Sequence, residues 1–164
     1  MTSSHYLIAL GSNQRHAAIG SPRSIIAEAI ARLKRSDLVV EAVSPIIGSR
    51  PVGPSSRRYA NAAIIARTDL DPAELLGLLK STEAEFGPRR GQDWSRRVLD
   101  LDIILWGGGL WSSDRPALTI PHPLMRERSF VLGPAAAIAP DWRDPVTGLR
   151  LTHLRHRLNR FRSS

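Results

Sequence analysis

The sequence predicts an α+β domain with a ferredoxin-like antiparallel sheet in the order βαββαβ, helices packed on that sheet and a C-terminal helical extension. Short apolar runs typical of strands alternate with two amphipathic runs typical of helices. Both helical runs carry their own start signals. The chain has 164 residues, which suits a single domain, 1–164, that buries its core without disulfides.

The first strand is expected near residues 5–10, HYLIAL, because this apolar run is closed by the turn signal GSN. A helix is expected over the following SPRSIIAEAIARLKR, with Ser21 as N-cap and Pro22 at the first helical position. Its apolar residues recur at helical spacing, and cations occupy its last turn. This segment therefore predicts an amphipathic helix.

The middle of the chain predicts two strands, 38–49 and 58–68, separated by a loop rich in Pro, Gly, Ser and Arg. A second helix follows, with Asp71 as N-cap, Pro72 at N1 and Glu74 at N3 as in a capping box. Gly87 is expected as its C-cap. Residues 98–106, VLDLDIILW, then predict the last strand of the sheet.

The C-terminal third predicts helices. Residues 123–140 are expected to form one or two helical segments broken at Gly133 and Pro134, and residues 151–162, LTHLRHRLNRFR, a basic helix.

Charge and composition restrict the class of function. Lys plus Arg number 23 against 15 Asp plus Glu, a net charge of +8, and the excess of arginine favours anionic partners such as phosphates. Nucleic acid is a second candidate partner. The absence of cysteine excludes disulfides, thiolate nucleophiles and Cys-ligated zinc. The N-terminal residues match neither a signal peptide nor a membrane span, so we expect a cytoplasmic protein without a membrane partner.

Two aspartates stand one residue apart in the last predicted strand. Alternation directs Asp100 and Asp102 to one face and the intervening Leu101 to the other. Like charges roughly 7 Å apart are relieved by water, by protonation, by arginine partners or by a hard cation such as Mg²⁺. From these residues alone, a solvated strand face with arginine salt bridges and a metal site both stay open.

Other segments carry chemistry of the same kind. Glu83 falls on the apolar stripe of the second helix, either as a stripe-edge residue or with a functional role. Tyr59 and Asn61 share a strand face, where a ring and a primary amide suit a flat heterocycle or form an ordinary cross-strand contact.

Arginines gather in two places. The loop before the last predicted strand suits phosphate clamping or is simply a basic loop, because four arginines surround Trp94: Arg89, Arg90, Arg96 and Arg97. His122 lies between two prolines, before a helical segment whose first turns carry Arg126 and Arg128. This is a candidate anion site or a structural turn.

Together these segments resemble the 6-hydroxymethyl-7,8-dihydropterin pyrophosphokinases. The resemblance follows the chain in order through ALGSN at 9–13, RPVGP at 50–54, YANA at 59–62, RVLDLDIILWG at 97–107 and IPHPLMRERSFVL at 120–132. It implies an ATP-dependent diphosphokinase of folate biosynthesis, which yields AMP and the pterin diphosphate. It also favours a monomer.

The resemblance further implies the roles of individual residues. Two Mg²⁺ ions would be held by Asp100 and Asp102, and Arg97, Arg89 and Arg90 would act in catalysis beside them. The residues implied for ATP binding are Glu83, Arg89, Arg90, Trp94, Arg97, Ile103, Thr119, His122 and Arg128. Those implied for pterin binding are Ser49, Pro51, Val52, Tyr59, Asn61, Trp94, Asp100 and Phe130.

The alternatives are a divergent paralogue acting on a related pterin alcohol, a generic magnesium-dependent nucleotidyltransferase and an RNA-binding module. Ferredoxin-like sheets can bind RNA through exposed aromatic residues. Here the predicted sheet face offers carboxylates, which repel a phosphate backbone, and the aromatic RNA motif is absent. We therefore expect small-molecule substrates and no nucleic acid.

Overall fold

The protein is described by a computed structural model that covers residues 2–49, 59–87 and 98–162. Its main sheet is antiparallel, with the strand order β2-β4-β1-β5 and the short β3 paired to β4 beside β2. The strands are β1 Ser4–Ser12, β2 Val39–Val43, β3 Ile47–Ser49, β4 Tyr59–Thr68 and β5 Asp100–Trp106. A separate hairpin is formed by β6 Trp111–Asp114 and β7 Ala117–Ile120.

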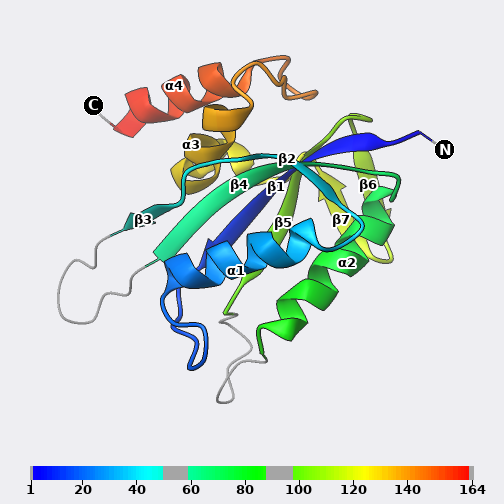
Figure 1. The fold of residues 1–164 in the computed structure, drawn as a ribbon. Helices are drawn as coiled ribbons and strands as arrows, with labels where there is room; N and C mark the ends of the chain where they lie inside the picture. Colours follow the sequence, from blue (N-terminus) through cyan, green and yellow to red (C-terminus); the bar gives the residue numbers. More distant parts are fainter. Residues whose placement is uncertain (1, 50–58, 88–97, 163–164) are drawn as a thin grey trace.

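The helices cover both faces of the main sheet (Figure 1). One face carries α1 Pro22–Lys34 and α2 Pro72–Glu85, and the other carries α3 Ser129–Ile138 and α4 Leu151–Arg162. A short 3₁₀ turn, η1 Met125–Glu127, precedes α3. No helix in the described part of the chain is both long and apolar enough to cross a membrane.

Local side-chain chemistry sets the starts of α1 and α2, as the sequence predicts. Ser21 accepts a hydrogen bond from the Ser24 N–H at 3.3 Å. Asp71 accepts from the Glu74 N–H at 2.8 Å while the Glu74 carboxylate accepts from the Asp71 N–H at 3.0 Å, a complete capping box. The cap at the other end of α2 is Phe86, one residue before Gly87, whose φ of 102° ends the helix.

The strand expected over 38–49 is two strands. Pro45 has no N–H to donate to the ladder, so β2 ends at Val43 and β3 begins at Ile47. Ser44 binds the segment between β2 and β3 to β4. Its N–H donates to the Ala63 carbonyl at 2.9 Å, and its hydroxyl accepts from the Ala63 N–H at 2.8 Å. The expectation of one strand was therefore wrong because proline divides the run.

The helix break expected at Gly133 and Pro134 does not occur. Pro134 lies inside α3 and cannot donate to the carbonyl of Phe130, four residues before it. The helix nevertheless continues, because residues on both sides of the proline, among them Leu132 and Ala135, are buried against the sheet. Packing of this apolar face outweighs the missing hydrogen bond.

The two faces of the sheet bury separate cores. The core under α1 and α2 contains Ile8, Leu10 and Leu101, whereas the core under α3 and α4 contains Leu7 and Ile104. Neighbouring residues of one strand therefore enter opposite cores, as the pleat requires.

Candidate active site

The candidate site lies on the sheet face that carries α3, beyond the core that α3 and α4 bury there. The strand register places Gly11 of β1 between Asn61 of β4 and Asp100 of β5, and it places Ala9 opposite Asp102. This part of the face borders a cleft of about 630 Å³. Six of the residues predicted for the site line the cleft: Tyr59, Asn61, Asp100, Asp102, Arg128 and Phe130.

The paired carboxylates of β5 both line this cleft. Asp100 is exposed and Asp102 is half-buried, whereas Leu101 between them is fully buried on the opposite face. The predicted alternation is confirmed. The residues of β1 that pair with Asp102 and Asp100 are the small Ala9 and Gly11, and both carboxylates border the cleft.

The absence of a side chain at Gly11 leaves room for the amide of Asn61. A Cβ placed on Gly11 would lie 3.1 Å from the Oδ1 of Asn61, closer than an ordinary van der Waals contact. The Asn61 amide therefore lies across the glycine, on the same face as the carboxylates of β5.

Two aromatic rings line the cleft and remain accessible. Tyr59 at the start of β4 is 47% exposed and Phe130 in the first turn of α3 is 44% exposed. The guanidinium carbon of Arg128 lies 5.6 Å from the centroid of the Phe130 ring, within the range of a cation–π contact. The cleft thus combines exposed ring surface with a fixed cation.

His122 lies close enough to Asp102 and Arg128 for their charges to act on it. Its backbone N–H donates to the Ile104 carbonyl at 3.0 Å, which fixes it beside β5. Its Nδ1 accepts from the Leu124 N–H at 3.1 Å, so in the neutral imidazole the proton is on Nε2. Burial lowers the pKa of His122, Asp102 opposes that shift and Arg128 adds to it.

Glu83 reaches β5 from the opposite side. Its carboxylate is buried, and Oε2 accepts from the backbone N–H of Leu101 at 2.7 Å. Oε1 accepts from the Lys80 ammonium at 3.1 Å. Glu83 therefore supports the backbone between the two aspartates and does not line the cleft.

The remaining predicted residues lie elsewhere or outside the described segments. Ile103 is buried in the core under α1 and α2, and Thr119 is exposed on the hairpin opposite Ser112. Ser49 ends β3. Six predicted residues are outside the described part of the chain: Pro51, Val52, Arg89, Arg90, Trp94 and Arg97.

The structure corrects the sequence-based interpretation of Arg126. Its guanidinium pairs with the buried Asp144, with Nε to Oδ2 at 2.6 Å and Nη2 to Oδ1 at 2.8 Å. Only Arg128 of the two arginines lines the cleft. Arg126 lies within the 3₁₀ turn η1 and Arg128 directly follows it, so the two side chains point in different directions, which α-helical spacing does not predict.

Sequence reasoning missed several lining residues, among them Ala9, Gly11, Ile47 and Ser129. A usable signal for the first two was present, because ALGSN places two small residues on alternate positions of one strand. Ile47 and Ser129 carried no such signal, since their approach depends on how β3 and α3 pack.

The donor set of the cleft suits a hard cation. Within the described residues, no group of three or more His, Cys, Asp or Glu side chains is placed to hold a metal ion. Two carboxylates beside open space match Mg²⁺, which is commonly held by one or two carboxylates together with water and substrate phosphates. Neither imidazole nor thiolate ligation is needed.

Paired carboxylates, an arginine, accessible rings and a primary amide in one cleft are groups that suit an enzyme of phosphoryl-type transfer. The sequence profile of the 7,8-dihydro-6-hydroxymethylpterin-pyrophosphokinase family matches residues 7–140. The chain belongs to this family, whose members are pyrophosphokinases.

Individual relatives agree with the family match. The chain is 40% identical over 149 residues to the 2-amino-4-hydroxy-6-hydroxymethyldihydropteridine pyrophosphokinase of Synechocystis sp., covering 90% of this chain and 73% of the relative. It is 42% identical over 142 residues to the Pseudomonas aeruginosa enzyme of the same name, covering 84% and 82%.

A solved structure shows the same fold. The crystal structure of Plasmodium falciparum HPPK-DHPS with pteroate matches 99% of this chain with a TM-score of 0.73 at 13% identity. The chain spans 46% of that longer protein.

Proposed function

We propose that this cleft is the active site in which pyrophosphate passes from ATP to the hydroxymethyl group of 6-hydroxymethyl-7,8-dihydropterin, a step of folate biosynthesis. The family determines the class of reaction, and the proposal assigns it to particular residues. The observation that carries the assignment is the meeting of Asp100 and Asp102 with Asn61 and two accessible rings in one cleft. Such a site holds a flat heterocycle beside a cation-bound phosphate chain.

The pterin would lie against Tyr59 and Phe130. Ring stacking uses accessible aromatic surface, and both side chains provide it on the cleft side. The Asn61 amide offers a donor and an acceptor, which match the donor and acceptor edge of a pterin. The segment from Ser49 to Val52 is proposed to contribute backbone groups to the same edge, and Trp94 to contact the pterin and ATP.

Asp100 and Asp102 would hold two Mg²⁺ ions together with the phosphates of ATP. Bound magnesium would neutralise charge on the phosphate chain during transfer. The protein's own contribution is to fix both carboxylates on one rigid strand, with Leu101 anchored between them. Rigid placement of the carboxylates reduces the reorganisation needed during reaction.

Arg128 and the Nε2–H of His122 would bind phosphate oxygens as donors. The hydroxyl oxygen of the pterin attacks the β-phosphorus, the bond from that phosphorus to the α-phosphate oxygen breaks, and AMP leaves while the hydroxyl loses its proton. Arg89, Arg90 and Arg97 remain predicted partners of the phosphates. Further contacts with ATP are predicted for Ile103 and Thr119, and Glu83 acts through the strand it supports.

The proposal includes three broader expectations from the sequence. The order β2-β4-β1-β5 with helices between strands supports the ferredoxin-like assignment. Use of ATP supports a cytoplasmic location. The family resemblance favours a monomer, which sedimentation of the purified protein would test.

The reaction is tested by incubating purified protein with magnesium, ATP and the pterin alcohol, and separating the products. We expect AMP and the pterin diphosphate in equal amounts. Formation of ADP, or no turnover of this alcohol, would overturn the proposal. Parallel reactions with other pterin alcohols test the paralogue alternative, and the RNA-binding alternative is not favoured by the family.

The metal assignment predicts that Asp100→Asn and Asp102→Asn each lower kcat/KM by at least about 100-fold, or about 2.7 kcal/mol. Folding stability should change little, because each substitution removes one of two neighbouring like charges. Steady-state assays and thermal unfolding measure both effects. Asp37→Asn, an exposed acid outside the cleft, is the control, and near-normal activity of either cleft variant would contradict the assignment.

A further inference from the structure

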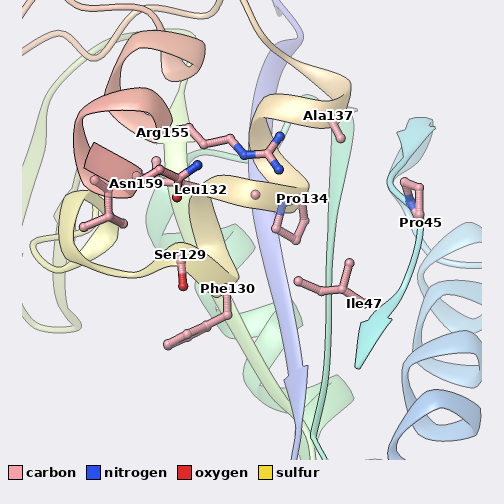
Figure 2. A pocket seen from close by; sticks show the side chains of 11 residues that line it. Pro45, Ile47, Ser129, Phe130, Leu132, Pro134, Ala137, Arg155 and Asn159 are labelled. Carbon is pink, nitrogen blue, oxygen red and sulfur yellow. The ribbon is translucent and has the colours of Figure 1, made fainter. Parts of the chain in front are cut away.

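A second pocket lies beside the proposed active site, between α3, α4 and the segment that joins β2 to β3 (Figure 2). Its volume is about 380 Å³, within the range of small-molecule sites. Its walls are formed by Pro45 and Ile47 on one side, Leu132 and Pro134 on α3, and Leu158 on α4. Most of this surface is apolar.

One positively charged side chain lines this pocket. Arg155 of α4 lines it, and Figure 2 shows its side chain extending from α4 in the direction of Pro134. The α4 sequence LTHLRHRLNRFR contains no acid. Within the described residues, Arg155 has no ion pair, so its charge is available to a ligand.

Only part of this pocket lies within the region that the family profile matches. The profile match ends at residue 140, whereas α4, which supplies Arg155, Leu158 and Asn159 to the pocket, begins at Leu151. The wall that carries the charge therefore belongs to a segment that the family match does not include.

We propose that this pocket binds a small organic anion with an apolar body and a single carboxylate. The apolar walls would bury the body of such a ligand, and the guanidinium of Arg155 would pair with its carboxylate in a forked arrangement. One arginine compensates one negative charge, so a monocarboxylate fits better than a nucleotide. A cationic ligand is disfavoured by the basic helix α4.

The second pocket shares Ile47, Ser129 and Phe130 with the proposed active cleft. A molecule bound in it would therefore contact the same phenyl ring that we propose to stack on the pterin. Occupancy should change the affinity for the pterin alcohol by at least about threefold. This consequence rests on the proposed function, whereas binding in the pocket does not.

Binding is tested by calorimetric titration with 2-naphthoate and with its neutral isostere 2-naphthamide. We expect naphthoate to bind the intact protein and the amide to bind at least about tenfold more weakly, since a charge-assisted hydrogen bond contributes about that factor. No binding of naphthoate up to its solubility limit, or equal binding of the two compounds, would overturn the proposal.

Two variants place the binding at this pocket. Arg155→Gln should weaken naphthoate binding at least about tenfold, whereas Arg157→Gln, the same charge change on the same helix outside the pocket, should leave it unchanged. Gly133→Leu should abolish it, because a Cβ at Gly133 meets nothing within 4 Å and the added side chain enters the open space. Thermal unfolding verifies that each variant is folded. Unaltered binding by Arg155→Gln or by Gly133→Leu would contradict the proposed location.

A separate titration with the pterin alcohol, with and without saturating naphthoate, measures the coupling. If the pterin binds normally and naphthoate leaves its affinity unchanged, the coupling is refuted while the proposed function stands. If naphthoate binds in its pocket and the pterin does not bind at all, the proposed function fails and the second site stands.

Discussion

At the scale of single residues, Glu83 links the helical layer to the metal strand. β5 forms an edge of the main sheet, so the backbone N–H groups on its outer side need partners other than a strand. The Leu101 N–H finds one in the buried Glu83 carboxylate at 2.7 Å. A charged acceptor makes this a stronger bond than a neutral one, and it fixes the backbone from which both aspartates project.

We predict that Glu83→Ala lowers the free energy of unfolding by about 1–3 kcal/mol, because it leaves the buried Leu101 N–H without its acceptor. Activity should fall with it as the aspartates lose their alignment. Glu83→Gln keeps an acceptor oxygen, so it should lose less stability and less activity than Glu83→Ala. Urea unfolding and steady-state kinetics measure the two effects.

The matched control is Lys80→Ala, which removes only the half-exposed partner of the same carboxylate. Lys80 is 47% exposed, so water replaces part of its interaction with Glu83, and Lys80→Ala should lower stability less than Glu83→Ala. If Glu83→Ala were as stable and as active as Lys80→Ala, the hydrogen bond to Leu101 would have no role in supporting the strand.

At the scale of elements, the pair Arg126 and Asp144 fastens η1 to the turn that precedes α4. Asp144 is fully buried and also accepts from the Val146 N–H at 3.0 Å and the Thr147 hydroxyl at 2.8 Å. Because η1 leads directly into Arg128 and α3, this cluster holds one wall of the active cleft against the C-terminal part of the chain.

The cluster predicts a stability that depends on acid pH. Burial alone would raise the pKa of Asp144, but its hydrogen bonds with Arg126, Val146 and Thr147 hold that pKa below the ordinary value of 3.8. A carboxyl with a lowered pKa in the folded state stabilises the protein above its unfolded pKa, and this contribution disappears as the pH falls through the folded value. Asp144→Asn should therefore cost about 3 kcal/mol at pH 7, and less below pH 3.8.

Urea unfolding of both proteins across pH 7 to pH 2.5 measures the difference. Asp141→Asn provides the control, since Asp141 is 81% exposed and lies 3.8 Å from Arg150, so its removal should change little at any pH. A constant difference between Asp144→Asn and the unaltered protein at all pH values would rule out the titration of Asp144 as its source.

The elements also show how far local sequence determines the fold. The starts of α1 and α2 were predictable because Ser21 and Asp71 satisfy N–H groups three residues away. The hairpin over 111–120 was not predicted, because its strands carry no clean alternation and are defined by pairing with each other. The continuation of α3 through Pro134 likewise depends on burial against the sheet, which is not local information.

The site divides in the same way. Period-two alternation predicted that Asp100 and Asp102 share a face and that Tyr59 and Asn61 share another. The alternation could not predict that these two pairs of residues lie on the same face of the sheet, because that depends on β1 lying between β4 and β5. The family resemblance supplied that association, and the register of Gly11 between both strands now accounts for it physically.

At the scale of the whole molecule, one sheet supports both cores. Each strand contributes alternate residues to the two sides, so Leu7 and Ile8 of β1 enter different cores although they are adjacent. Loss of packing on either side would therefore disturb the same hydrogen-bonded strands. This coupling favours cooperative unfolding of the chain as a single domain.

We predict that the chain unfolds in one transition and that two substitutions each lower its midpoint temperature, Tm. They are Leu79→Ala, in the core under α1 and α2, and Leu151→Ala, in the core under α3 and α4. Both leucines are fully buried, and such truncations cost about 2–5 kcal/mol. For a chain of this size, each kcal/mol lowers Tm by about 2–4 °C. Calorimetry and circular dichroism should give one transition with coincident midpoints, and Leu110→Ala, where the leucine is 63% exposed, should leave it in place. The strands are shared by both cores, so the loss of one core should also disrupt the other, and a single transition is expected. Two transitions, with each variant lowering the midpoint of only one, would contradict this and mean that the two faces of the sheet unfold independently.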